Sequence, residues 1–341
     1  MLKKLLILIL IPFLLCSCSR NNIEEISFAS WGSATETKIL HSLISEFEKN
    51  NPDIKVNFIH VPQNYFQKLH LLFASNQAPD VVFINNLYLP LYAKKLEPLD
   101  NFLDKNDFYP QSIQAMSYDS HLYAIPRDIS NLVFYYNKSL IKQNLNPDWN
   151  FSDFEKLLQK KYCKNCYATS FEPDVFIASP YITTLGYEKG INFYKNLEGR
   201  CAPNPAQVGS STLAQMFIEG RITFYLSGRW MYPKISETAK FPFGVITFPG
   251  IVPADSSGWA ISKDSKHKDS AKKFITFLAS KKSIEFMTKS GLIVPARIDA
   301  SYLLNNDNEK MFLKAIQKSE PQVISKDYKK NRDKLNKELF H

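Results

Sequence analysis

The segment Leu122–Asn137, which reads LYAIPRDISNLVFYYN, constrains the fold more than any other part of this sequence. Two short runs rich in β-favouring residues, Leu122–Ile125 and Leu132–Tyr136, flank a polar elbow at 126–131. Pro126 favours an extended backbone at the residue before it. A chain of 341 residues is too long for one ordinary hydrophobic core. We therefore expect two domains, with the elbow as the first crossing between them.

The composition is that of a globular protein. Hydrophobic residues make up 45% of the chain and charged residues 22%, and an aromatic content of 13% excludes a largely disordered chain. Only 11 of the 341 residues are glycine, which weighs against Gly-rich phosphate-binding loops.

The first seventeen residues have the pattern of an export signal. Lys3 and Lys4 precede an apolar run at 5–15 that is too short to span a bilayer. The sequence LCSC that ends at Cys18 resembles a bacterial lipobox, which implies cleavage before Cys18 and attachment of palmitate-type acyl chains there. An unlipidated secretory signal is the alternative. Residues 18–24 are expected to form a tether at the membrane.

Basic residues are concentrated near the C-terminus. Residues 310–341 contain nine Lys/Arg and four Asp/Glu. A basic tail is compatible with nucleic-acid binding, but the aromatic side chains that usually accompany it are not interleaved here. We therefore expect a solvated helix face and no nucleic-acid partner, with attraction to anionic lipid headgroups as a compatible addition.

Three cysteines follow the export signal: Cys163, Cys166 and Cys201. The CxxC spacing of the first two suits zinc or redox chemistry, but a structural zinc site needs four ligands, and neither a second CxxC nor a nearby His pair supplies them. We expect no metal. In an oxidising compartment a disulfide is favoured, but the pattern does not determine which cysteines pair.

Strand-like and helix-like segments alternate after residue 24, which predicts βαβ units on a parallel sheet and an α/β fold. The expected strands are Glu25–Trp31, Ile54–Val61 and Val81–Ile84, and the expected helices are Thr35–Asn50 and 64–75. Ligands bind beyond the carboxyl ends of such strands. This places Trp31 and the pair Asn85-Asn86 at the mouth of a site.

The rest of the chain also contains both helix-like and strand-like segments. We expect helices from Lys138, over Pro147–Leu158 and Ser210–Gly220, over Lys268–Ala279 and Lys281–Ser290, and over Lys326–Phe340; strands are expected over Ile222–Leu226, Phe243–Gly250 and Trp259–Ile261, the last of these after a polar loop.

Eight motifs together carry a resemblance to a known family. They are Phe47–Pro52, Ala78–Val81, Leu122–Pro126, Tyr135–Lys138, Pro203–Gly209, Phe217–Trp230, Gly258–Ile261 and Gly291–Arg297. Each motif alone is weak, but in their order and spacing the chain resembles the family 1 extracellular solute-binding proteins. These are the sugar-binding components of ABC importers, and the resemblance covers nearly the whole chain after the export signal.

The resemblance implies a two-lobed α/β fold of the periplasmic-binding-protein type II class, with a ligand cleft between the lobes. Lobe 1 would take residues 25–126 and roughly 259–294, and lobe 2 roughly 127–247 and 298–341. Crossings are expected near 126–131, 248–258 and 295–297. The family also implies a monomer without cofactors that faces the periplasm or the cell exterior. Its partner would be a membrane permease with a cytoplasmic ATPase.

A sugar needs flat aromatic platforms and a few directed hydrogen-bonding groups. The resemblance places three indoles at the cleft, those of Trp31, Trp230 and Trp259, whereas Trp149 is expected to pack in the core. The polar candidates from the same comparison are Asn85, Asn86, Ser130, Ser227 and Gly228, with Tyr65 as a weaker one.

Three arginines leave the ligand class open. Arg127, Arg229 and Arg297 lie at or near the expected cleft, and guanidinium groups bind phosphate in a bidentate manner. They would suit glycerol 3-phosphate or a related anion. Alternatively, Arg127 forms a hinge ion pair with Asp128 and Arg297 is a structural strut.

Parts of the sequence are also compatible with two other classes of protein. A secreted glycosidase would need a pair of carboxylates such as Asp80 and Asp128 across the sugar, but no nucleophile or metalloprotease motif accompanies them, so we expect no enzymatic activity. A structural or adhesive lipoprotein that has lost transport is compatible with the two amides Asn85 and Asn86, where relatives often carry an acidic group.

Overall fold

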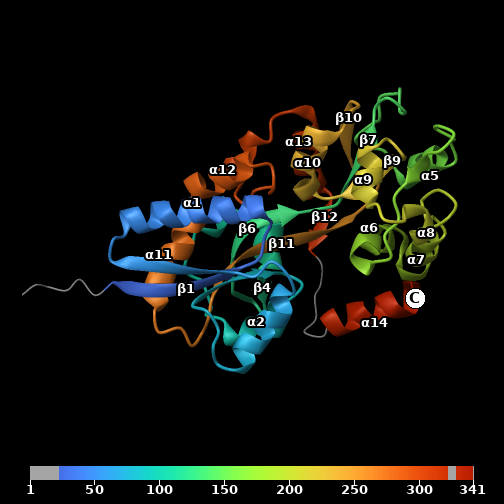
Figure 1. The fold of residues 1–341 in the computed structure, drawn as a ribbon. Helices are drawn as coiled ribbons and strands as arrows, with labels where there is room; N and C mark the ends of the chain where they lie inside the picture. Colours follow the sequence, from blue (N-terminus) through green and yellow to red (C-terminus); the bar gives the residue numbers. More distant parts are fainter. Residues whose placement is uncertain (1–22, 322–327, 341) are drawn as a thin grey trace, which may run out of the picture.

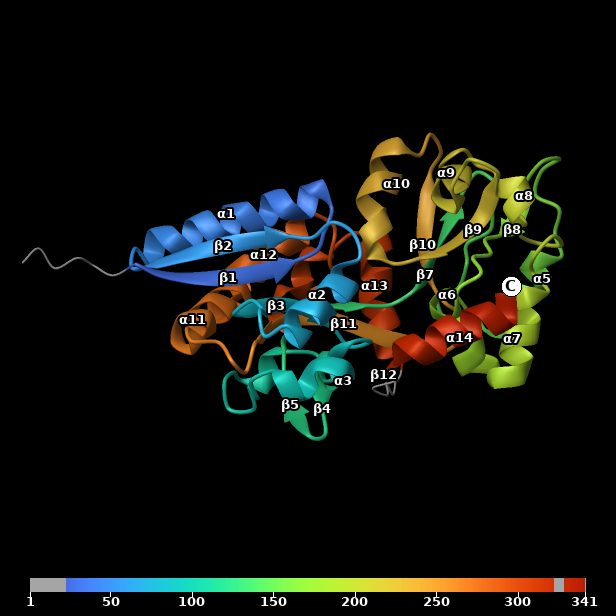
Figure 2. The same ribbon diagram turned by 60° about the horizontal axis from the view of Figure 1, so that its bottom comes forward.

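The computed structural model describes residues 23–321 and 328–340, which form two α/β lobes lying side by side (Figure 1, Figure 2). The α/β class expected from the sequence is confirmed. The export signal, Cys18 and most of the expected tether lie outside the described residues. No helix in the described ranges is both long enough and apolar enough to cross a membrane.

The first lobe is built on a sheet of six strands. They are β1 (Glu24–Ser30), β2 (Ile54–His60), β3 (Val81–Asn85), β6 (Ile125–Ser130), β11 (Val252–Ile261) and β12 (Ser319–Pro321). The main path of the sheet runs β12-β11-β3-β1-β2, and β6 also pairs with β11. β1 pairs in parallel with both β2 and β3, so the carboxyl ends of β1 and β3 reach the same edge of the sheet.

Helices from both ends of the lobe's sequence complete its core. These are α1 (Ala34–Asn50), α2 (Tyr65–Ala74), α11 (Lys268–Leu278) and α12 (Lys281–Lys289). α1 begins where Ser33 accepts a hydrogen bond from the backbone N–H of Glu36, and it buries a stripe that includes Phe47. Phe47 packs on Phe274 of α11, which in turn contacts Phe28 of β1.

The polar elbow expected at 126–131 is largely a strand, and this corrects the sequence-based prediction. β6 runs from Ile125 to Ser130 and pairs antiparallel with β11. Its polar side chains tolerate burial because Arg127 and Asp128 neutralise each other. The ladder is irregular at Pro126, which cannot donate a hydrogen bond. A Cβ at the opposing Gly258 would lie 2.0 Å from the carbonyl oxygen of Ile125, so this close approach requires glycine.

The polar loop expected before Trp259 is also a strand. β11 begins at Val252, its residues Asp255–Ser257 pair with β6, and Ser257 also lies opposite Asn85 of β3. The run ADSSG has little β propensity, but pairing with β6, and from Ser257 onward with β3 as well, satisfies backbone groups that a loop would leave to solvent.

The second lobe contains a four-stranded sheet in the order β10-β7-β9-β8. Its strands are β7 (Val133–Asn137), β8 (Tyr167–Thr169), β9 (Ile222–Ser227) and β10 (Phe243–Thr247). Successive residues of β7 face opposite sides, as a pleated strand requires: Phe134 belongs to one core, and Val133 and Tyr135 belong to the other.

Helices cover both faces of this second sheet. On the Phe134 side lie α5 (Phe151–Leu158), α6 (Val175–Leu185) and α7 (Tyr187–Lys195); on the Tyr135 side lie α9 (Leu213–Ile218), α10 (Tyr232–Thr238) and α13 (Asp307–Gln317). No helix begins at Lys138, because the backbone there turns, with the side chain of Asn137 accepting from the N–H of Ser139. α5 starts only after Asn150, its N-cap.

Short elements connect these layers. They are α3 (Leu89–Tyr92), η1 (Ala93–Lys95), η2 (Lys105–Asp107), α4 (Pro110–Ala115), β4 (Ser117–Tyr118), β5 (His121–Leu122), α8 (Pro205–Val208), η3 (Arg229–Met231) and η4 (Ile298–Leu303).

Within the described residues, the chain passes between the two lobes at several points. The first passage is at 131–132 and the second at 248–251, between β10 and β11. The segment expected as the third crossing, 295–297, instead runs beside β6, where the N–H of Ala296 donates to the carbonyl of Arg127. The chain then reaches the second lobe after η4, at Leu304, and continues into α13.

The C-terminal helix α14 (Tyr328–Phe340) lies against α6 of the second lobe (Figure 2). Its docking is polar as well as apolar. Asn336 accepts from the N–H of Val175, the first residue of α6, at 2.8 Å, and Arg332 forms an ion pair with Asp174 at 2.6 Å. Phe340 contacts Phe171.

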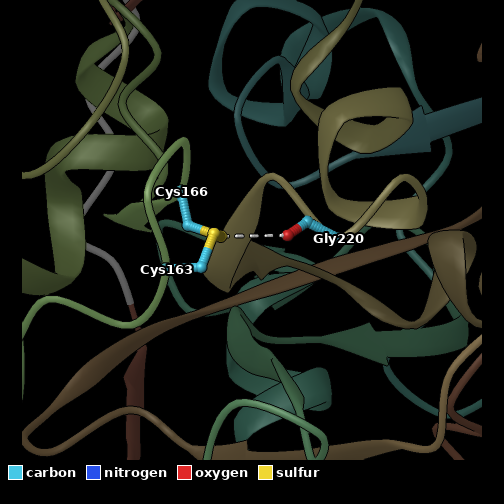
Figure 3. The surroundings of a disulfide bond; sticks show 3 residues. All are labelled: Cys163, Cys166 and Gly220. Carbon is cyan, nitrogen blue, oxygen red and sulfur yellow. Dashed lines mark hydrogen bonds between the residues drawn. A yellow bond between two sulfur atoms is a disulfide. The ribbon is translucent and has the colours of Figure 1, made fainter.

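One disulfide links Cys163 to Cys166 in the loop between α5 and β8 (Figure 3). The sulfur of Cys166 lies 3.5 Å from the carbonyl oxygen of Gly220, a van der Waals contact because a disulfide sulfur carries no proton to donate. Cys201 is a free, half-buried thiol. The structure thus resolves the pairing that the sequence pattern left open.

Candidate functional site

A cavity of about 610 Å³ lies at the junction of the two lobes. The first lobe lines it with the carboxyl ends of β1 and β3, the start of α1 and parts of β6 and β11. The second lobe contributes residues of α6, η3 and α14, and the segment after α12 closes one side. Its volume is typical of a site for a small organic ligand.

Aromatic rings form much of the cavity wall. Trp31 follows β1 and Trp230 lies in η3, and each indole is 39% exposed although it is large and apolar. Trp31 is supported from behind by Phe66 and Phe83 at centroid distances of 5.6 and 5.8 Å. Each of the two lobes thus presents one solvent-accessible indole to this cavity.

A second aromatic surface lies beside Trp31. The rings of Phe66 and Tyr88 are stacked, with centroids 3.8 Å apart and planes inclined by 7°. Both line the cavity, and Phe176 of α6 lines it from the second lobe. Neither Phe66 nor Tyr88 was predicted from the sequence to bind a ligand. Each lies close to a residue that was, since Phe66 directly follows Tyr65 and Tyr88 comes shortly after Asn85-Asn86.

Arg127 is buried at the cavity wall and is fully engaged by the protein. Its guanidinium forms ion pairs with Glu36 of α1 and with Asp128, the latter at 2.7 Å. It also lies 4.7 Å from the ring centroid of Phe83. Burial works against the charge, but the two carboxylates outweigh it and raise the pKa of Arg127 above its usual value. The prediction of an ion pair with Asp128 is confirmed.

Asp128 is in turn held by β11. Its carboxylate accepts from the N–H of Ser257 at 3.1 Å and from the Ser257 hydroxyl at 2.6 Å. Its backbone carbonyl accepts from the hydroxyl of Ser256. Side-chain and main-chain bonds therefore fix this part of the cavity wall before any ligand arrives.

Three further charged cavity residues were not predicted from the sequence, and one of them is Glu36 at the start of α1. Asp255 is half-buried on β11, and Arg332 comes from α14. Asp255 was not predicted because the composition of ADSSG is typical of a loop. Arg332 was not predicted because a basic helix near the C-terminus is typical of a solvated helix face.

Of the polar candidates from the sequence, Asn85 and Ser130 line the cavity. Asn85 also turns the chain after β3, because its side chain accepts from the N–H of Tyr88 at 3.2 Å. Asn86 does not line the cavity but accepts from the N–H of Ser256. Tyr65 is buried, with its hydroxyl between the carbonyls of Ala29 and Phe83.

The loop after β9 brings only Trp230 to the cavity. Ser227 is buried at the end of the strand, and the carbonyl of Gly228 accepts from the hydroxyl of Tyr135 at 2.8 Å. Arg229 is buried away from the cavity. It pairs with Glu309 of α13 and donates to the carbonyls of Thr288 and Ile293, and so ties η3 to the segment after α12.

Two other candidates lie outside the cavity. Trp259 is 0% exposed in the core of the first lobe, which corrects the expectation that its indole faces the cleft. A strand that begins at Val252, and not at Trp259, places this residue in mid-sheet. Arg297 forms ion pairs with Asp107 and Asp299 at 2.8 and 2.9 Å, as expected of a structural strut.

The carboxylates considered for a glycosidase do not face each other across the cavity. Asp80 lies before β3, where it accepts from Ser27 and Ser265, and only Asp128 lines the cavity. In residues 23–321 and 328–340, no three His, Cys, Asp or Glu side chains are placed to hold a metal ion.

Two lobes around one aromatic-walled cavity define the class of two-lobed solute-binding folds. The bacterial extracellular solute-binding protein family matches residues 31–285, and the chain belongs to that family. The fold and the family expected from the sequence are therefore confirmed.

Relatives of known name support this assignment. The maltotriose-binding protein of Pyrococcus abyssi is 22% identical over 303 residues, which cover 79% of this chain but only 63% of that protein. An ABC substrate-binding protein from Listeria monocytogenes in complex with cycloalternan is 25% identical, with a TM-score of 0.80 over 93% of this chain and 92% of that one. UgpB from Mycobacterium tuberculosis, in complex with glycerophosphocholine, has a TM-score of 0.74 over 88% and 87% of the two chains, and at 20% identity shows the fold alone.

Proposed function

We propose that this protein binds a sugar in the cavity between its lobes and delivers it to the permease of an ABC importer. The observation that carries the proposal is the pair of half-exposed indoles, Trp31 and Trp230, which line one cavity from opposite lobes. Indole faces stack on the C–H faces of sugar rings, and carboxylates and amides in the same wall accept and donate to hydroxyls. The named ligands of the relatives from Pyrococcus and Listeria are sugars.

The charge state of the wall favours a neutral solute over an anion. In the cavity wall, Arg127 is already paired with two carboxylates and Arg332 with Asp174. Arg229 and Arg297 lie outside the cavity with carboxylate partners of their own. A phosphate would have to break such pairs, at a cost of several kcal/mol for each buried one. We therefore do not favour glycerol 3-phosphate, the alternative that the three arginines suggested.

The lobes and the anchor belong to the same proposal. Closure of one lobe on the other around the solute would bring Trp31 and Trp230 together. Cys18, with its lipobox-like sequence, would hold the protein as a monomer at the outer face of a bacterial membrane. Replacement of Cys18 by Ser is expected to release the protein into the soluble fraction and to abolish palmitate labelling; a variant that stays membrane-bound would contradict the anchor.

Calorimetry with a panel of maltose, maltotriose, cycloalternan and glycerol 3-phosphate tests the ligand class. A sugar with a micromolar dissociation constant, or about 8 kcal/mol of binding free energy, is expected to raise the thermal midpoint visibly at saturation. Glycerol 3-phosphate is expected to give no shift. Failure of every sugar in a broad panel would leave the structural or adhesive lipoprotein as the better explanation.

A further inference from the structure

A second hollow, of about 340 Å³, lies beside the cavity, between α2 and the segment that begins at Tyr88 and continues into α3 (Figure 2). Two of its lining side chains, Phe66 and Tyr88, also line the cavity. Because the rings of these two residues are stacked on each other, one aromatic pair borders both spaces. The hollow therefore adjoins the proposed sugar site.

The hollow exposes large apolar side chains to water. Leu71 of α2 is 68% exposed and Leu91 of α3 is 41% exposed. Single exposed leucines are ordinary on a protein surface, but these two line one concave space together with the rings of Phe66 and Tyr92. A group that fills this space removes apolar surface from water, which is favourable. The hollow thus favours an apolar occupant.

The two elements that form the hollow are held together by the protein itself. The hydroxyl of Tyr92, in α3, donates to the carbonyl of Phe66, in α2, at 3.0 Å. The ring of Tyr92 also stacks on Phe73 of α2, with centroids 5.2 Å apart. At the other end of the hollow, the side chain of Asn85 accepts from the N–H of Tyr88 and holds the turn after β3. A preformed surface of this kind loses little conformational entropy on binding.

The hollow offers few partners to sugar hydroxyls. Among the described residues, no Asp, Glu, Lys or Arg lines it, whereas the wall of the cavity contains both carboxylates and guanidinium groups. Its polar side chains other than the tyrosines are Gln67 and His70, both exposed, and the hydroxyl of Tyr92 already donates to a carbonyl. A sugar ring placed here would find partners for few of its hydroxyls, but an aromatic ring has no hydroxyl to satisfy.

We infer that the solute is an aryl glycoside, whose sugar lies between the lobes and whose aryl group occupies the hollow between α2 and α3. The inference rests on the proposed function and deepens it, since it names the class of sugar derivative. Phe66 is a direct neighbour of Trp31, with centroids 5.6 Å apart, so a substituent on a sugar stacked on this indole reaches Phe66 and Tyr88. Aromatic rings pack favourably on the aromatic side chains that line the hollow.

Calorimetry with the methyl and phenyl glycosides of glucose, galactose and maltose, in both anomeric forms, tests the inference. We expect at least one phenyl glycoside to bind about tenfold more tightly than its methyl counterpart, because its ring buries additional apolar surface. In the double variant Leu71→Ser/Leu91→Ser, the ratio of the two dissociation constants should fall by about threefold or more. Phe286→Ser is the matched control and should keep the ratio, since Phe286 is 46% exposed but lines neither space.

The outcomes separate the inference from the function on which it rests. Equal affinities of the native protein for every phenyl glycoside and its methyl counterpart overturn the inference and leave the proposed function intact. An unchanged ratio in the double variant also overturns it, because the phenyl ring then lies outside the hollow. The ratio is taken within one variant, so a general loss of stability does not alter it. If no glycoside and no free sugar binds, the proposed function falls and the inference falls with it.

Discussion

The guanidinium of Arg127 lies between two carboxylates, those of Asp128 on its own strand and Glu36 on α1. The arginine therefore joins the start of the first helix to the strand from which the chain leaves the first lobe. A residue that resembled a phosphate ligand in the sequence is a structural cation in the cavity wall.

Replacement of Arg127 by Met is expected to leave two carboxylates at the wall without their cation. Breaking a buried pair in this way costs about 3–5 kcal/mol of unfolding free energy. Urea denaturation measures the loss. Arg297→Met is the control: its partners Asp107 and Asp299 are half-exposed, so its loss should be markedly smaller. Equal losses in the two variants would show that the Arg127 pairs contribute no more than surface pairs do.

The two accessible indoles should carry sugar affinity. Trp31→Ala and Trp230→Ala are each expected to weaken maltotriose binding by at least tenfold, because each removes one stacking surface. Calorimetry gives the affinity, and thermal unfolding without sugar serves as the control for folding. If both variants bind as the native protein does, the sugar does not stack on these rings.

Trp259→Ala should behave in the opposite way. Truncation of a fully buried indole costs about 3–5 kcal/mol of unfolding free energy, through lost burial and the cavity left behind. Any fraction that folds should retain sugar affinity, since the residue does not line the cavity. A stable variant with weakened binding would contradict its placement in the core.

The stability of the sugar-free protein should depend on Asp255. Burial and the negative charge of Asp128 raise its pKa to about 7 in the folded protein, from about 4 in an unfolded chain. Below pH 4, Asp255 is protonated in both the folded and the unfolded chain, so it does not lower the free energy of unfolding. Between pH 4 and 7 the unfolded chain ionises first, so stability falls as pH rises. Asp255→Asn should remove this decline, and its advantage in thermal midpoint over the native protein should be larger at pH 8 than at pH 5. A difference in thermal midpoint that is the same at pH 5 and pH 8 would show that the pKa of Asp255 is not raised in the folded protein.

The Cys163–Cys166 disulfide closes a very short loop that does not itself line the cavity. Loop-closure entropy for such a loop is worth about 2 kcal/mol. The double variant Cys163→Ser/Cys166→Ser should lose no more than this in urea denaturation and should bind sugar normally. Cys201→Ser, which removes the free thiol, is the control. A loss of sugar affinity in the double variant would indicate coupling between this loop and the cavity.

The sequence predicted the first lobe well, because local signals there agree with the tertiary structure. The helix expected over Thr35–Asn50 is α1, and the strands expected near Ile54 and Val81 are β2 and β3. Apolar periodicity and caps suffice for such elements.

Prediction failed where tertiary pairing overrides composition. The polar segments at 126–131 and before Trp259 became strands only because β6 and β11 pair with each other. This error placed Trp259 at the cleft and hid Asp255. Likewise, the local sequence does not show whether Arg127 pairs with Glu36, ninety-one residues away, or binds a phosphate. The family resemblance predicted Trp31 and Trp230, but it did not predict which carboxylates pair with the arginines and so set the charge of the cavity wall.

α14 gives the cavity its last charged residue, Arg332, while the first indole follows β1 near the other end of the chain. A polypeptide emerges from the ribosome with its N-terminus first, so the cavity wall is incomplete until the chain has been made as far as Arg332. The strands β1, β2 and β3 of the first lobe are made early, but at that stage the cavity lacks the wall that the second lobe provides. A deletion that removes α14 therefore takes away part of the cavity wall itself.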